Sequence, residues 1–253
     1  MTSSSTVTFA RDGHIAVITL NRPEQRNAIN AEMGAALSDA ISELEDTQDL
    51  HVGILRGAGP AFCAGMDLGA FLSGEAERIL FGPGRLGGLV SRTRRTPLIA
   101  SVHGPAIAGG FELVLACDLA VASRDAVFGL PEAKIGLIAG AGGAIRLAQC
   151  LPRVVANELL LTGRTITAER AAALGLINQV VAQEDLEATV RALAADVADA
   201  VPASVAASLE IAQKARSESD EGLWHENDRH LRARLASDEA KHAAQAFQKS
   251  GKS

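Results

Sequence analysis

The fold is decided by residues 98–117, which read LIASVHGPAIAGGFELVLAC. The apolar run at residues 98–102 predicts a buried strand, and the Gly104-Pro105 pair ends it. Residues 110–117 are apolar around one carboxylate, Glu112, and predict a helix that begins at a glycine turn. Short strands that alternate with helices and turn on glycine or proline are typical of a parallel sheet.

The same alternation of strand and helix extends to both sides of this stretch. Asn30 can cap a helix that starts at residue 31, because apolar residues follow it at helical spacing on one face. The other predicted elements before residue 152 are strands at residues 14–20, 52–55 and 119–122, a short helix after Met66 and a helix at residues 145–151. The sequence therefore predicts an α/β fold.

The pattern changes after Pro152, where alanine, leucine and charged residues dominate. A strand pattern survives there only at residues 177–181, and residues 185–248 predict three helices. Pro202 separates the first two helices, and residues 217–222 separate the last two.

These two patterns divide the chain. We predict a catalytic core at residues 1–184 and a helical C-terminal region at residues 185–253. The last predicted helix carries the apolar residues Leu231, Leu235, Ala243 and Phe247.

Composition excludes several classes of protein. The 253 residues carry a net charge of −6 and only 3% aromatic residues, which argues against nucleic-acid binding. The sequence has no apolar run long enough to span a membrane, and its start lacks the features of a secretory signal. Cys63, Cys117 and Cys150 lack metal-binding spacing, and the six histidines form no ligand pairs. We therefore expect a cytoplasmic protein with reduced cysteines and no metal.

Two glutamates in apolar surroundings are the candidate proton carriers. Glu112 follows a glycine pair, and Glu132 follows a proline in the run Phe128-Gly129-Leu130-Pro131-Glu132. An ionised carboxylate is costly among apolar groups, so two such carboxyls close together can take opposite protonation states. Each glutamate could instead be a structural residue that compensates the dipole at the N-terminus of a helix.

Two glycine turns are candidate anion sites. The first spans residues 108–110 and the second spans residues 64–67. Backbone N–H groups at such turns can converge on one oxygen and stabilise negative charge there. The alternative, which is the commoner use of glycine, is a tight turn that needs a positive φ.

Two further features carry weaker signals. The run GPGRLG at residues 82–87 has the spacing of a dinucleotide-binding loop, but a helical segment precedes it where that motif needs a strand. His103, beside Gly104, is better interpreted as a structural residue than as a substrate contact.

Taken together, these segments resemble the crotonase (enoyl-CoA hydratase/isomerase) superfamily over nearly the whole chain. The runs that carry the resemblance are residues 21–30, 61–68, 108–112, 128–132, 140–147, 161–164 and 173–178. The resemblance implies a crotonase-like β-β-α spiral core and a helical C-terminal trimerisation region. It also implies a homotrimer or dimer of trimers that acts on an acyl-CoA thioester, with no cofactor beyond the coenzyme A of the substrate.

The resemblance also implies roles for individual residues. The backbone N–H groups of Met66 and Gly109 would hold the thioester oxygen, and Glu112 and Glu132 would share the acid and base work. The positions that it assigns to binding of the substrate and its coenzyme A are Arg22, Gln25, Arg26, Ala28, Ala64, Asp67, Leu68 and Gly110. The family often has a lysine, which reaches a CoA phosphate, at the position of Gly69, and this chain lacks it.

Because both glutamates are present, the resemblance favours enoyl-CoA hydratase. The first alternative is carnitinyl-CoA dehydratase, which the segments around Gly82, Glu112 and Glu132 resemble. A second is enoyl-CoA isomerase. The non-enzymatic alternative is a paralogue that binds acyl-CoA or RNA without turnover, although the acidic charge argues against RNA.

Overall fold

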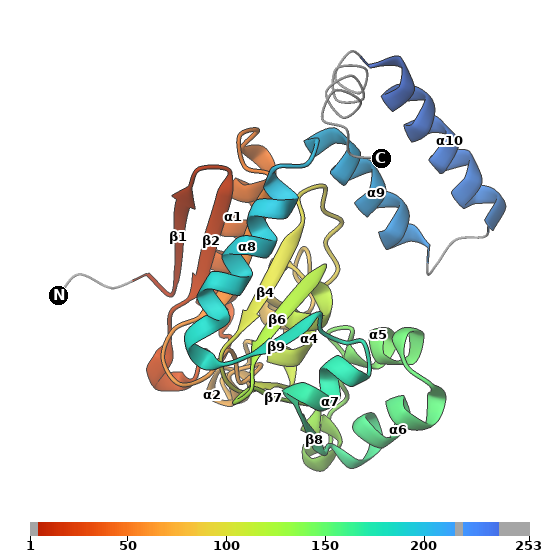
Figure 1. Cartoon of the computed structure of the whole chain (residues 1–253). Helices are drawn as coiled ribbons and strands as arrows, with labels where there is room; N and C mark the ends of the chain where they lie inside the picture. The colour runs from red at the N-terminus through yellow and green to blue at the C-terminus, as the bar shows by residue number, and fades with distance from the viewer. Residues whose placement is uncertain (1–4, 216–219, 238–253) are drawn as a thin grey trace.

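A six-stranded sheet lies at the centre of the structure, a computed structural model that describes residues 5–215 and 220–237 (Figure 1). Its strand order is β1-β2-β3-β4-β6-β9. The strands are β1 (Val7–Asp12), β2 (Ile15–Leu20), β3 (Val52–Gly57), β4 (Leu98–Val102), β6 (Leu119–Ser123) and β9 (Gln179–Val181). All neighbours from β2 to β9 pair in parallel, which confirms the predicted parallel sheet.

The strand β1 was not predicted. It pairs antiparallel with β2, with Phe9 opposite Ile18, and extends the sheet at its edge. Most of its residues are exposed or half-buried, so it lacks the continuous apolar run that identifies the buried strands.

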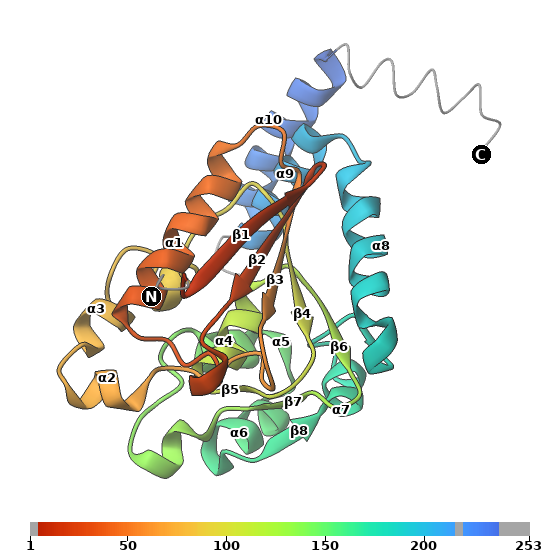
Figure 2. The same ribbon diagram turned by 90° about the vertical axis from the view of Figure 1, so that its left-hand side faces the viewer.

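A second, smaller sheet lies below the first in Figures 1 and 2 and has the order β5-β7-β8. Its strands are β5 (Ala106–Ile107), β7 (Val127–Gly129) and β8 (Thr165–Thr167). The prediction that residues 177–181 form the only strand after Pro152 is therefore wrong. The strand β8 has three residues, of which both threonines are exposed, so no hydrophobic pattern marks it.

Helices cover both faces of the large sheet (Figure 2). On one face, α1 (Ala31–Asp46) buries Met33, Leu37, Ile41 and Leu44, and the Asn30 side chain caps it as predicted by accepting from the Met33 N–H at 2.9 Å. On the other face, α8 (Leu186–Ala198) packs its buried residues against β-strand residues such as Val52 and Ile99. The division at residues 184/185 remains a prediction, and α8 packs directly on the sheet of the core.

The helix α4 (Gly109–Ala116) follows β5, and its residues 109–114 are buried in the core. The remaining helices of the core are α2 (Leu68–Leu72), α3 (Ala76–Leu80), α5 (Gly143–Cys150), α6 (Arg153–Thr162) and α7 (Ala168–Ala173). The 3-10 turns are η1 (Pro23–Gln25), η2 (Leu86–Gly88), η3 (Pro131–Ile135) and η4 (Gln183–Asp185).

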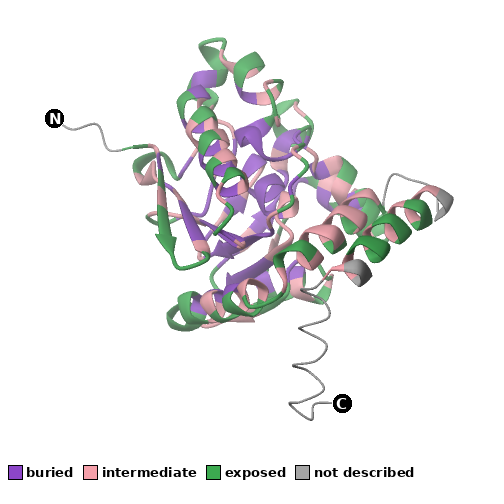
Figure 3. Cartoon of the chain, turned by 90° about the horizontal axis from the view of Figure 1, so that it is seen from above, coloured by how far each residue is buried: buried purple, intermediate pink, exposed green. Residues whose placement is uncertain are grey.

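The helices α9 (Pro202–Lys214) and α10 (Asp220–Ala236) project away from the core, at the right in Figures 1 and 3. No residue of α9 is buried, and on α10 the side chains of Trp224 and Leu231 are 68% and 50% exposed. The predicted helical positions Ala243 and Phe247 lie outside the described residues.

Within the described residues, no single helix has the length and apolar character needed to cross a membrane. One pair of segments passes that test together, Gln183–Ala198 with Pro202–Lys214, and it is bent by 104° at the break between them.

Candidate active site

The two predicted glycine turns lie against each other. A parallel bridge joins Cys63 to Ala106, in which the Cys63 N–H donates to Pro105 and the Ile107 N–H donates to Cys63. A Cβ atom at Gly65 would lie only 2.8 Å from the Gly109 nitrogen, so the two backbones are in direct contact. The turns are therefore held by sheet-like pairing of the segments that precede them.

The glycines of these two turns are required for different physical reasons. Gly65 has a φ of +90°, as a left-handed turn requires. Gly109 and Gly110 do not have a positive φ, so that interpretation is wrong for them. A side chain at Gly110 would instead collide with the Cys63 carbonyl, and Ala108 takes the positive φ, at 53°.

The N–H groups of Met66 and Gly109 donate to no other residue in the described part of the chain. A Cβ atom on Gly109 would lie 3.5 Å from the Met66 nitrogen, so the two donors are neighbours. The Gly109 N–H also lies at the positive end of the α4 dipole. Such a pair of free donors can stabilise an oxygen that gains negative charge.

The carboxyls of Glu112 and Glu132 are both buried, with 3% and 7% of each residue exposed. The first turn of α4 supplies Glu112, and the 3-10 turn η3 supplies Glu132. Glu112 accepts a hydrogen bond from the Gly143 N–H at 2.8 Å, whereas Oε2 of Glu132 has no partner among the described residues. The Gly143 N–H was not predicted as a partner of Glu112, although the glycine run at residues 140–143 gave a local signal for exposed backbone.

Burial changes the proton affinity of both groups. It raises the pKa of Glu112 to about 7, and the nearby Glu132 charge acts in the same direction while the Gly143 hydrogen bond opposes it. Burial also raises the pKa of Glu132. The Glu132 charge opposes ionisation of Glu112, and two carboxyls that oppose each other's ionisation can hold one proton between them.

A buried asparagine anchors the turn that carries Met66. The Asn27 side-chain amide donates to the carbonyls of Ala61 and Phe62 at 2.8 and 3.1 Å. The Cys63 thiol in turn donates to the Asn27 carbonyl at 3.1 Å, and burial raises the pKa of this thiol to about 12. Asn27 was not predicted as a site residue, because nothing in the local sequence shows that it reaches a segment more than thirty residues away.

Seven of the eight residues predicted to bind the substrate and its coenzyme A lie on two adjoining segments, residues 22–28 and 64–68, and the eighth, Gly110, lies on α4. Gln25 and Arg26 are exposed at the end of η1, and Leu68 is exposed at the start of α2. The guanidinium of Arg22 forms an ion pair with Asp67 at 3.0 Å and also donates to the carbonyl of Ala28. Ala64 is half-buried and donates its N–H to the carbonyl of Arg26, while Gly110 is buried against Cys63. Arg26 is therefore more available to a phosphate than Arg22.

The two weaker sequence signals have structural explanations. Residues 82–87 follow the helix α3 and fold into the turn η2, which supports the rejection of a dinucleotide loop. A ring nitrogen of His103 lies 2.8 Å from the Gly59 carbonyl, as a structural role predicts.

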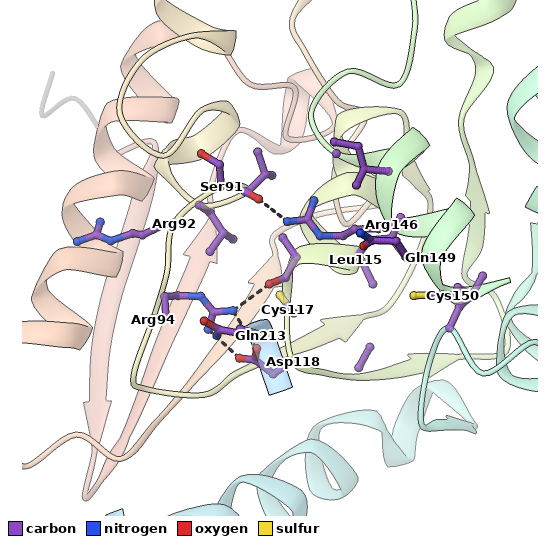
Figure 4. Close-up of a pocket in the computed structure, with 18 of the residues that line it drawn as sticks. Ser91, Arg92, Arg94, Leu115, Cys117, Asp118, Arg146, Gln149, Cys150 and Gln213 are labelled. Carbon is purple, nitrogen blue, oxygen red and sulfur yellow. Dashed lines mark hydrogen bonds and ion pairs between the residues drawn. The ribbon is translucent and has the colours of Figure 1, made fainter. Parts of the chain in front are cut away.

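A cavity of about 760 Å³ lies at the C-terminal end of α4 and contains neither Glu112 nor Glu132 (Figure 4). The buried guanidinium of Arg94 lines it and forms two hydrogen bonds with Asp118, at 2.7 and 3.1 Å. Arg146 reaches across the same cavity to the Val90 carbonyl. Residues of α4 and α5, the helices that carry Glu112 and its donor Gly143, line part of this cavity.

One group of possible metal ligands occurs in the described residues, where Glu210 on α9 lies close to Glu226 and His230 on α10. Lys214 pairs with Glu210 at 3.0 Å, and Arg229 pairs with Glu226 at 2.5 Å. Because these cations already balance the carboxylates, we interpret the group as an ion-pair network that joins the two helices.

Comparison with known proteins gives a consistent result. The model of the family described as enoyl-CoA hydratase/isomerase matches residues 10–253. A carnitinyl-CoA dehydratase from Salmonella typhi is 39% identical over 251 residues, which cover 96% of this chain and 95% of that protein. The crystal structure of an enoyl-CoA hydratase from Mycobacterium tuberculosis H37Rv is 41% identical, with a TM-score of 0.92 over 97% of this chain and 96% of that one. The crystal structure of a carnitinyl-CoA hydratase from Mycobacterium avium is 38% identical, with a TM-score of 0.81 over 98% and 97%.

The raised pKa of Glu112 predicts a stability effect that depends on pH. Because the folded state binds this proton more tightly than the unfolded state, stability falls as the pH rises from about 4.5 to about 7. Glu112→Gln removes the buried charge, so it should raise the melting temperature at pH 8, where the charge costs on the order of 3 kcal/mol. The gain should shrink towards pH 5. Thermal unfolding at several pH values checks this, with the exposed Glu184→Gln as control, and a gain independent of pH would contradict it.

Proposed function

The chain belongs to the enoyl-CoA hydratase/isomerase family, and on that premise we propose that it adds water reversibly to the 2,3 double bond of a 2-enoyl-CoA thioester. The observation that carries this proposal is the buried carboxyl pair, Glu112 and Glu132, beside the free N–H groups of Met66 and Gly109. The names of the relatives support an enzyme of this kind.

The proposed chemistry begins at the thioester oxygen. The Met66 and Gly109 N–H groups donate to that oxygen, and their hydrogen bonds strengthen as negative charge moves onto it. A water molecule attacks the β-carbon while one carboxylate accepts a proton from it. The other carboxyl group donates its proton to the α-carbon, which leaves a 3-hydroxyacyl thioester.

The carboxyl pair suits this exchange because it can hold one proton between two sites at neutral pH. The hydration of a thioester conjugated with a double bond requires one acid and one base. We assign these roles to the pair and not to either residue alone. The reaction as proposed uses no metal and no cofactor beyond the coenzyme A of the substrate.

The coenzyme A is proposed to lie along the segments at residues 22–28 and 64–68. The exposed Arg26 guanidinium is the proposed contact for a CoA phosphate, since Arg22 is already paired with Asp67 and Gly69 offers no side chain. The exposed Gln25 and Leu68 flank the same surface.

A second candidate substrate is a carnitinyl-CoA or crotonobetainyl-CoA thioester. The observation that favours it is the set of curated relatives at 39% identity over nearly the full chain, which are named carnitinyl-CoA dehydratase. Such a substrate would place a trimethylammonium group in the acyl pocket. The chain has no tyrosine and one tryptophan, Trp224, so recognition would depend on a carboxylate more than on an aromatic cage.

We also propose that the protein is a trimer or a dimer of trimers in the cytoplasm, with a core of residues 1–184 and an assembly region of residues 185–253. The support is the apolar surface that α9 and α10 leave uncovered, including Trp224 and Leu231. The three cysteines, whose thiols are free, are consistent with a reducing compartment.

The carboxyl pair predicts the behaviour of two single variants. Glu112→Gln and Glu132→Gln should each lower kcat for crotonyl-CoA hydration by about 10²–10⁴-fold, because each removes one proton carrier. The KM should change little, since neither group is proposed to contact coenzyme A. Loss of the enoyl-thioester absorbance measures the rate, and near-normal turnover in either variant would remove that residue from the mechanism.

A substrate panel separates the two candidate substrates. Enoyl-CoA thioesters of increasing length and crotonobetainyl-CoA should be compared by kcat/KM. We expect the uncharged enoyl-CoA thioesters to react faster. A clear preference for crotonobetainyl-CoA would favour the dehydratase, and double-bond migration without hydration would favour an isomerase.

The exposed apolar surface of α9 and α10 predicts assembly. Light scattering of the full chain should give the mass of a trimer or hexamer. Truncation before Leu231 should reduce both assembly and solubility, because it removes the end of α10 and exposes apolar surface on the residues that remain. A stable, active monomer of the full chain would contradict the prediction.

A further inference from the structure

The Gly143 N–H, which donates to Glu112, lies in a turn that the Arg146 side chain covers. Gly143 begins α5, and the preceding Gly142 has a φ of +105° and carries no side chain that caps the helix. The Arg146 guanidinium curls back over Gly142, where any Cβ atom would collide with its Nη1. The Arg146 side chain therefore packs on the turn that directs the Gly143 N–H at Glu112.

The same guanidinium holds a second segment of the site. Arg146 donates to the carbonyl of Val90, across the cavity of Figure 4. The Val90 N–H is bonded to Leu86, and a Cβ atom on Gly109 would lie 2.6 Å from the Leu86 side chain. Leu86 thus packs on the glycine that carries one of the two free donors.

We propose that Arg146 is a positioning residue for Glu112, because it joins the Gly142–Gly143 turn to the Leu86–Val90 segment that covers Gly109. This inference rests on the proposed function, in which Glu112 and the Gly109 N–H act on one substrate. A small displacement of either group would misalign the acid and base with the thioester, which is how groups remote from the reaction affect its rate.

The charge of Arg146 adds an electrostatic effect to this contact. The charged groups that act on Glu112 in the described structure are Glu132 on η3 and Arg146 on α5. Burial raises the pKa of Glu112 to about 7, whereas backbone hydrogen bonds from Gly143 and Ala141 lower it and the Arg146 charge lowers it to a smaller extent. Removal of Arg146 takes away its charge and weakens the Gly143 hydrogen bond, so Glu112 should become harder to ionise.

The direct test is a titration that needs no turnover. The carboxyl carbons of the glutamates are labelled with ¹³C in Glu132→Gln, so that Glu112 titrates without its partner. Its signal is assigned by its absence from Glu112→Gln. Adding Arg146→Met should raise the midpoint of Glu112 by about half a pH unit or more. Arg146→Lys, which keeps the charge, should give a smaller shift.

Kinetics of crotonyl-CoA hydration in the otherwise native chain test the positioning itself. Arg146→Met should lower kcat by about 10-fold or more, with KM within about twofold, and should move the acid limb of kcat/KM to higher pH. Arg146→Lys should recover part of the rate. The matched control is Arg92→Met, since Arg92 lines the same cavity but bonds to Ser38 and Ser42 on α1. This control should keep the kcat and the pH profile of the unaltered chain.

The outcomes separate the two proposals. If the unaltered chain hydrates no enoyl-CoA but the Glu112 midpoint still moves as expected, the proposed function fails and the contact between Arg146 and Glu112 stands. If the chain is active but Arg146→Met shifts neither the midpoint nor kcat more than Arg92→Met does, the positioning role is overturned. A loss confined to KM would overturn it as well. Should Arg146→Met fail to fold, Arg146→Lys decides by the same comparison, and unaltered kcat and midpoint in that folded variant would overturn the role.

Discussion

The close approach of two backbone segments is the constraint on which the site depends. The bridge between Cys63 and Ala106 brings the chain before α4 against the turn that carries Met66. No side chain fits at Gly110 or Gly65 at this separation, so contact requires glycine at both positions, and at Gly65 the positive φ favours it as well. The bridge leaves two N–H groups side by side that have no acceptor in the described part of the chain, and the helix that follows carries Glu112 in its first turn.

The burial that follows from this packing gives the carboxyls their proposed chemistry. In a low-dielectric environment an ionised carboxylate is costly, and hydrogen bonds to developing charge are stronger than in water. Among the described residues, Glu112 accepts a hydrogen bond from the Gly143 N–H and one oxygen of Glu132 has no partner, so the two groups are not equivalent. An asymmetric pair that shares one proton is suited to donate a proton to one carbon of a double bond and to accept a proton from the water molecule that attacks the other carbon.

Local patterns in the sequence predicted the parts of this structure that depend on local packing. The strand β4 and the helix α4 lie within a residue or two of their predicted bounds, because each is a continuous apolar run between glycine or proline turns. The exposed edge strand β1 and the three-residue β8 carry no such run. The contacts of Glu112 with Gly143, and of Asn27 with Ala61, join residues about thirty positions apart, and only the folded chain brings them together. The positive φ at Ala108 could not be predicted from the sequence either, since alanine rarely adopts a positive φ.

The proposed reaction requires a thioester oxygen to bind between the N–H groups of Met66 and Gly109, with the carboxyl pair at the neighbouring carbons. A crystal structure of the protein with a bound 3-hydroxyacyl-CoA tests it most directly. We expect the carbonyl oxygen to lie within about 3.2 Å of both backbone nitrogens, and the hydroxyl group to lie within hydrogen-bond distance of Glu112 or Glu132. A bound thioester whose oxygen lies away from both nitrogens, with the carboxyls out of reach of the α- and β-carbons, would contradict it.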